Sequence, residues 1–299
     1  MYELVNANKK LREVSQKEYK TIIQAKSYIL FYLQFEELFE LVKANFHDFW
    51  NYIFEICEIQ RLNFITDFSE LIDPILFSNQ KLANILSSFQ TYIDHLKHSI
   101  SNNFCKNSEE YQTCETIFCE VYDLSFSYRI MSRLRNYIQH FGLPITQITY
   151  DSKLINREPI EWIQFVNLML DRNMLLKYKK WSTVKKEIEE LDEYFDIKPF
   201  VNNYYNNLNN IHSKMRYILK KKYDESKSLL KNIIKEEFSE QERLRFWSII
   251  NPSIFIYQIK GDEIINKVYI PYNVIKRIDK LLKRNICSHK KGISYSIIK

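Results

Sequence analysis

The sequence predicts a mainly all-α protein, with room for one small β-hairpin near the C-terminus. Three observations support this class: helical periodicity along most of the chain, only three glycines in 299 residues, and helix stop signals where the periodicity ends. Hydrophobic residues make up 45% of the chain, which is enough for a sizeable core.

The first third of the chain is read as helical. Apolar residues recur every three or four positions from Lys17 to Phe54, and the polar run Gln34–Glu36 suggests two helices broken at that point. Asp73-Pro74 predicts a turn. A further helix is expected from Lys81 to His98, because Leu82, Ile85, Leu86, Phe89, Ile93 and Leu96 form one apolar stripe.

The middle third predicts helices separated by short breaks. One helix is expected over Cys114–Phe141, followed by a short extended piece at Gln147–Tyr150. Another helix is expected after Glu158-Pro159, since proline is favoured in a first helical turn. Ser182 is a candidate cap for a helix that reaches Phe195.

The last third begins with a helix after Lys198-Pro199. Its apolar residues repeat at spacings of three and four, a seam suited to packing against another helix: Val201, Tyr204, Leu208, Ile211, Met215 and Ile218. The pattern continues over Asp224–Phe238. Ser253–Ile259 and Val268–Ile270 are rich in β-branched and aromatic residues, so a hairpin is expected there, and a basic helix follows over Pro271–Arg284.

Several classes of protein are excluded or disfavoured by composition. No glycine-rich phosphate-binding loop is present, which excludes Rossmann and P-loop enzymes. No signal peptide or membrane span is found, so a cytoplasmic protein without a membrane partner is expected. The five cysteines form no C-x-x-C pair and are expected to be reduced thiols. No metal site and no cofactor are predicted.

Positive charge is concentrated at the C-terminus. The chain has a net charge of +6, and residues 260–299 contain ten lysines and arginines against three acids. Such a tail can bind a phosphate backbone electrostatically. It can equally be a solvated basic helix with a frayed end, and the sequence leaves both interpretations open.

The end of the helix predicted over 114–141 holds the residues that can carry chemistry. Its stripe of polar side chains at steps of four, three and four consists of Arg129, Arg133, Asn136 and His140. Arg135 lies at the flank of this stripe, since five residues turn a helix by roughly 140° relative to His140. Gly142-Leu143-Pro144 then closes the helix.

The segment Leu-Arg-Asn-Tyr-Ile-Gln-His at 134–140 resembles the Arg-(x)4–6-His motif of HEPN domains, which are small helical bundles found in many prokaryotic ribonucleases. The resemblance covers roughly residues 20–150. It implies a HEPN-like helical domain over 1–150. The periodicity and the basic residues beyond it predict a helical extension with a basic C-terminal tail over 151–299.

This resemblance implies metal-independent RNA cleavage, in which the ribose 2′-hydroxyl attacks its own phosphate. His140 is the candidate general acid or base, and Arg135 is the candidate ligand of the scissile phosphate. Asn136 can orient either of them through its amide. Asp94 on a neighbouring helix is a candidate additional acid. The resemblance also implies a homodimer with a composite active site and a role as a toxin or antiviral effector.

Other interpretations of the same residues remain open. An arginine and a histidine at a helix end often satisfy backbone carbonyls or pair with acids. The chain could then be a non-catalytic dimeric module that binds RNA or protein, or a subunit of a defence complex with an antitoxin or other partner protein. Asp94, His95 and His98 could in principle ligate a metal, but a polar helix face is the preferred interpretation.

Overall fold

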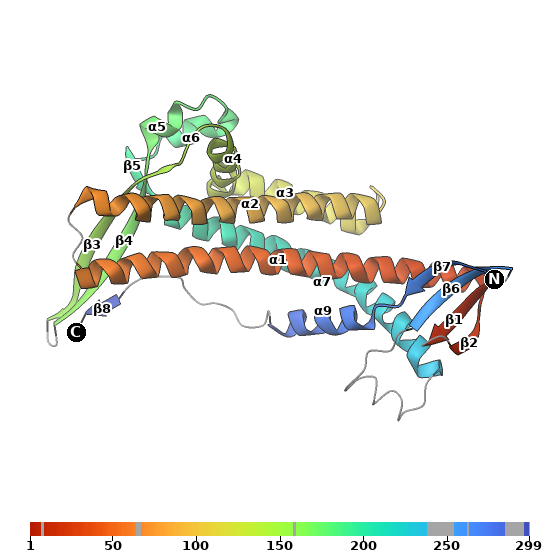
Figure 1. The fold of residues 1–299 in the computed structure, drawn as a ribbon. Helices are drawn as coiled ribbons and strands as arrows, with labels where there is room; N and C mark the ends of the chain where they lie inside the picture. Colours follow the sequence, from red (N-terminus) through yellow and green to blue (C-terminus); the bar gives the residue numbers. More distant parts are fainter. Residues whose placement is uncertain are drawn as a thin grey trace. The chain divides into compact units, whose positions relative to one another are not determined.

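The computed structural model describes residues 1–6, 9–63, 67–157, 160–237, 254–261, 263–284 and 296–298. The described chain is mainly helical, as expected, but it also contains two small antiparallel sheets (Figure 1). The mainly helical character is confirmed, but the two sheets make the fold α+β and not all-α. The chain divides into a first unit, Met1–Glu37 with Met215–Ser288, and a second unit, Leu38–Lys214 with His289–Lys299.

The first unit contains a four-stranded antiparallel sheet in the order β2-β1-β6-β7. The strands are β1 (Tyr2–Asn6), β2 (Lys9–Val14), β6 (Ile254–Lys260) and β7 (Glu263–Tyr269). Leu4 pairs with Ile256, which pairs with Val268, and all three side chains are buried. The predicted hairpin is confirmed, and Gly261 in its turn adopts a φ of +62°, a conformation that favours glycine. The two N-terminal strands were not predicted.

The helices of the first unit are the start of α1 (Gln16–Asn63), the end of α7 (Lys198–Glu237) and α9 (Tyr272–Arg284). Both the α7 seam and the basic helix were predicted, and α7 runs without a break through the segment expected after Asp224. The expected break at Gln34–Glu36 was wrong, because α1 is continuous there. Glu36 is fully buried and its carboxylate accepts hydrogen bonds from Arg216, so a polar residue on the apolar face is stabilised.

The second unit contains the rest of α1, the start of α7 and the remaining described elements. Its helices are η1 (Phe68–Leu71), α2 (Ile72–Asn103), α3 (Glu109–Leu124), α4 (Phe126–His140), α5 (Arg172–Leu176), η2 (Ser182–Val184) and α6 (Lys185–Glu189). Its strands are β3 (Ile145–Arg157), β4 (Ile160–Asp171), β5 (Tyr194–Asp196) and β8 (Ser296–Ile298). The strand β4 pairs with β3, β5 and β8, and α2 packs against α3, α4 and β3 (Figure 1).

The helix expected over Cys114–Phe141 is in fact two helices that meet at Ser125. The Ser125 hydroxyl accepts a hydrogen bond from the backbone N–H of Tyr128, at 3.2 Å, and so caps the start of α4. Asp73-Pro74 is not an isolated turn but the first turn of α2. Proline is tolerated there because the first backbone N–H groups of a helix have no intrahelical acceptor.

The helix expected after Glu158-Pro159 was also wrong, since residues 160–171 form β4. Val166, Leu168 and Leu170 are buried at every second position, which is the period of a strand. The extended piece at 147–150 is confirmed but belongs to the longer strand β3. Glu158 and Pro159 lie outside the described residues.

Ser182 does not cap a long helix. It is the first residue of η2 and has a φ of +56°, and the helix α6 that follows ends at Glu189. Phe195, the expected end of that helix, lies in β5.

Three further predictions concern domains, cysteines and the tail. The predicted boundary at 150 falls inside β3, and the assignment of 1–150 and 151–299 stays a prediction. The described cysteines at 57, 105, 114 and 119 are free thiols, whereas Cys287 lies outside the described residues. The tail beyond Arg284 also lies outside them, apart from β8. No helix among the described residues is both long and apolar enough to cross a membrane.

Candidate active site at the end of helix α4

The helix α4 packs one face into the second unit and leaves its C-terminal end accessible. Its buried side chains include Ile130, Met131 and Leu134, whereas His140 is exposed. The helix ends where predicted, because the carbonyl of Tyr137 accepts the N–H groups of both Phe141 and Gly142, at 2.8 and 3.2 Å. Gly142 lies outside the positive-φ region, so the stop does not depend on a left-handed glycine.

Arg135 and Asn136 are brought together by this helix. Both are half-buried, and Nη1 of Arg135 donates to Oδ1 of Asn136 at 3.4 Å. The Nε of Arg135 is buried and has no acceptor among the described residues. No described carboxylate pairs with Arg135 either. A half-buried arginine with no described acid beside it is suited to bind an anion.

His140 is the last residue of α4, and its side chain makes no hydrogen bond with the described part of the chain. Five residues of helix separate it from Arg135, a rotation of roughly 140° and a rise of about 7.5 Å. The three predicted residues therefore lie on one helix end, but the His140 side chain forms no described hydrogen bond with the Arg135–Asn136 pair.

Arg129, which the stripe grouped with Asn136 and His140, has a structural role. Its guanidinium donates to the carbonyls of Tyr122 and Asp123 at the end of α3, at 2.6 and 2.8 Å. It also forms an ion pair with Glu187 of α6. These contacts satisfy terminal carbonyls of α3 and join three helices. Arg133 is half-buried and has no described ion pair.

An aromatic cluster, which the sequence did not identify, lies behind the helix end. The ring of Tyr137 stacks on Trp181 at 5.8 Å between centroids, and Tyr178 contacts Tyr137, Phe141 and Trp181. Trp181 is fully buried and donates to the carbonyl of Leu175, as expected for a core anchor. The cluster fixes the last turn of α4, whereas Phe141 keeps 48% of its surface exposed beside His140.

Asp94 does not lie beside His140. The Asp94 carboxylate accepts a hydrogen bond from Nε2 of Gln90, at 2.7 Å. Burial raises the pKa of the Tyr128 phenol near the start of α4, and the charge of Asp94 adds to that effect. Twelve residues of helix separate Tyr128 from His140, or about 18 Å. His98 contacts Asn102 at 2.9 Å instead of Asp94. The described residues contain no group of three potential metal ligands.

Comparison of the chain with family models, with curated proteins and with solved structures found no match.

Proposed function

We propose that this protein is a metal-independent endoribonuclease whose active site contains Arg135, Asn136 and His140. The observation that carries the proposal is the state of Arg135. Its guanidinium is half-buried, is contacted by Asn136 and has no described carboxylate to neutralise it. A structural arginine would be expected to use its donors on acids or carbonyls, as Arg129 does.

The reaction is transesterification at the RNA backbone. The 2′-oxygen forms a bond to the adjacent phosphorus while the bond from phosphorus to the 5′-oxygen of the next nucleotide breaks. The 2′-hydroxyl loses its proton to a base, and the departing 5′-oxygen gains one. The products are a 2′,3′-cyclic phosphate and a 5′-hydroxyl. His140 transfers one of these protons, since imidazole can act as acid or base near neutral pH.

Arg135 stabilises the charge that develops on the phosphoryl oxygens, through two-point contacts that a guanidinium can make. Asn136 holds the guanidinium in place and so acts as a positioning residue. The exposed ring of Phe141 offers a stacking surface for a base beside His140.

The separation between His140 and Arg135 supports a homodimer. Within one chain the two side chains diverge around the helix, so a phosphate held by Arg135 is better placed to meet His140 of a second copy. A two-fold axis would create two such composite sites. The biological setting, as a toxin or an antiviral effector with a controlling protein, is part of the proposal by resemblance only.

The test is cleavage of single-stranded RNA in excess EDTA by wild type, Arg135→Ala and His140→Ala. Each substitution is expected to lower the rate by about 100-fold or more. The matched controls are Arg61→Ala, which removes a surface i,i+3 ion pair, and His98→Ala, both expected to keep full activity. The cut RNA should carry 5′-hydroxyl ends, and a substrate without 2′-hydroxyls should stay intact.

Contamination is the main risk, because other ribonucleases give the same products. If all five proteins, purified in parallel, cut equally well, the cleavage comes from elsewhere and the assigned site is wrong. The composite site is tested by mixing the two inactive variants. Random exchange makes about half of the dimers mixed with one intact site each, so roughly a quarter of wild-type activity should return. No recovery would refute the arrangement in two copies.

The rival function is a non-catalytic HEPN-like module that binds RNA or protein, alone or within a defence complex. It is favoured by the absence of contact between His140 and the Arg135–Asn136 pair. RNA binding that depends on Arg135, without cleavage by any of the proteins, would support this function over the ribonuclease.

A further inference from the structure

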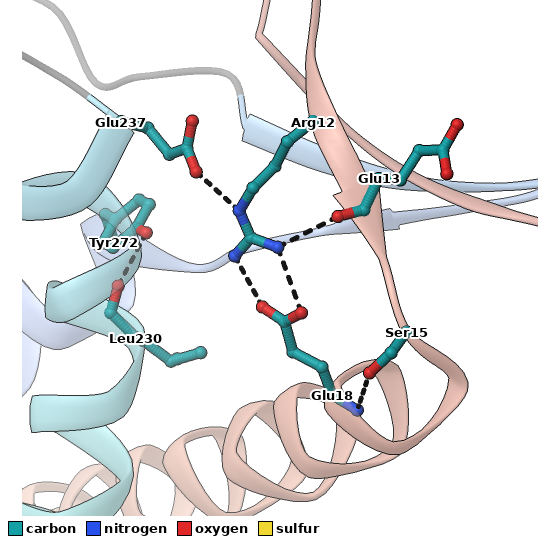
Figure 2. A network of polar contacts seen from close by, with 7 residues as sticks. All are labelled: Arg12, Glu13, Ser15, Glu18, Leu230, Glu237 and Tyr272. Carbon is teal, nitrogen blue, oxygen red and sulfur yellow. Dashed lines mark hydrogen bonds and ion pairs between the residues drawn. The ribbon is translucent and has the colours of Figure 1, made fainter.

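The helix α9 is held firmly in the first unit by its apolar face. Tyr272, Ile275, Ile278 and Leu281 are buried. The hydroxyl of Tyr272 donates to the carbonyl of Leu230 in α7, at 2.8 Å (Figure 2).

The single acid of α9 is already used inside the unit. Asp279 accepts hydrogen bonds from Tyr223 at 3.1 Å and from Lys227 at 2.5 Å, both on α7. Burial and the nearby charge of Lys227 together lower the pKa of Lys231, one turn further along α7. The excess of positive charge around α9 is therefore not cancelled by its own aspartate.

The outer face of α9 is basic. Arg277, Lys280, Lys283 and Arg284 are exposed, and Lys276 is half-buried. Arg277 reaches Glu37 at 3.3 Å, a pair in which both side chains are about half exposed, so this bond is weak. Lys280, Lys283 and Arg284 have no acidic partner among the residues that the structure describes. Arg277, Lys280 and Arg284 follow one another at i, i+3 and i+7, so they form one stripe.

The burial of the apolar face of α9 determines which kind of ligand its outer, basic face can bind. A helix that lies on an anionic membrane must insert large apolar side chains between the lipids. The apolar face of α9 is buried in the protein, and no large hydrophobic side chain of α9 is strongly exposed. A rigid stripe of exposed cations without an insertable apolar face matches a phosphodiester backbone instead.

We propose that the outer face of α9, through Lys280, Lys283, Arg284 and Arg277, binds the sugar-phosphate backbone of single-stranded RNA. This surface captures RNA by charge and takes no part in the chemistry at His140. The choice of RNA rests on the proposed function, whereas the argument from charge does not.

The test measures the affinity of a short fluorescent single-stranded RNA for His140→Ala protein, so that binding is read without cleavage. The triple change Lys280→Gln, Lys283→Gln and Arg284→Gln is added to this background. Each lost phosphate contact removes about 0.7 from the slope of log K against log salt. The slope should therefore fall by about 2, and the affinity by tenfold to roughly a hundredfold at about 0.1 M salt.

Two matched variants separate local contacts from net charge. Lys9→Gln, Lys17→Gln and Lys20→Gln remove the same charge from exposed positions of the first unit and should leave affinity within about twofold. Lys280→Arg, Lys283→Arg and Arg284→Lys keep the charge and should keep the binding.

The proposal is overturned if the glutamine variant of α9 binds RNA as wild type does, or if the control variant loses as much. It is also overturned if wild type sediments with phosphatidylserine vesicles through α9 while RNA affinity is unaffected by the change. If wild type does not cleave RNA although it binds RNA through α9, the result would count against the proposed active site alone.

Discussion

Glu36 and Glu37 are neighbours in α1 with the same chemistry and opposite environments. The Glu36 carboxylate is fully buried and accepts two hydrogen bonds from Arg216, at 2.8 and 2.5 Å. The Glu37 side chain is 46% exposed and meets Arg277 at 3.3 Å. We predict that Glu36→Gln strongly destabilises the first unit and that Glu37→Gln does not.

The expected loss in the free energy of unfolding depends on how the arginine partner is left after each substitution. Removing one partner of a buried ion pair typically costs about 3–5 kcal/mol, because the other charge stays desolvated without compensation. Arg216 keeps 21% of its side chain exposed, and a glutamine can still accept a hydrogen bond from it. We therefore expect a loss of about 2–3 kcal/mol for Glu36→Gln. For the exposed pair the expected loss is below about 0.5 kcal/mol.

Urea unfolding followed by far-ultraviolet circular dichroism provides the comparison. With a slope of roughly 3 kcal/mol per molar urea, Glu36→Gln should lower the midpoint by somewhat less than 1 M, while Glu37→Gln leaves it in place. Hydrogen exchange in peptides that cover 28–36 and 215–223 should accelerate only in the first variant. Equal midpoints for the two variants would show that the buried pair contributes no more than a surface pair.

Two further predictions concern the glycines and the tyrosines. Gly261→Ala should lower the free energy of unfolding by about 1 kcal/mol, because Gly261 has a φ of +62°. Gly142→Ala should be neutral or stabilising by about 0.5 kcal/mol, because the added Cβ meets only the Tyr137 hydroxyl at 3.9 Å. Thermal unfolding measures both, and equal effects would refute the assignment of strain to Gly261. Burial raises the pKa of both Tyr204 and Tyr205 to about 12, so the stability that they contribute is complete below the unfolded value of 10.0 and is lost as pH rises from there to about 12. Unfolding free energies measured across this window should fall, and tyrosinate absorbance should rise together with the loss of structure; a titration of all tyrosines near 10 in the folded chain would contradict this.

The helices that the sequence predicted correctly are those whose buried apolar positions recur with the helical period. The seam from Val201 to Met215 is an example, since each of its residues is buried in α7. The period of 3.6 is a local property, so it can be read without knowledge of the partner. The break expected at Gln34–Glu36 failed because the compensating charge, Arg216, lies 180 residues away in the sequence.

The strands were harder to predict because their stability comes from their neighbours. The stretch Ile160–Asp171 contains leucine, methionine and phenylalanine, which suit a helix or a strand, and Pro159 before it resembles a helix start. What decides the matter is antiparallel pairing with β3 on one edge and with β5 and β8 on the other. The same holds for β1, whose long-range partner is β6.

At the candidate site the sequence supplied residue types and their order along the helix, and the end of α4 at His140 follows from them. The sequence could not show which arginine already uses its guanidinium in structural hydrogen bonds and ion pairs. Arg129 and Arg135 are alike in sequence, yet Arg129 donates to the end of α3 and to Glu187, while the Arg135 side chain donates only to Asn136 among the described residues. That difference depends on where the carbonyls of a neighbouring helix fall in space. It is also what separates the two arginines chemically, because only a guanidinium with unused donors can take up a phosphate without first losing a structural contact.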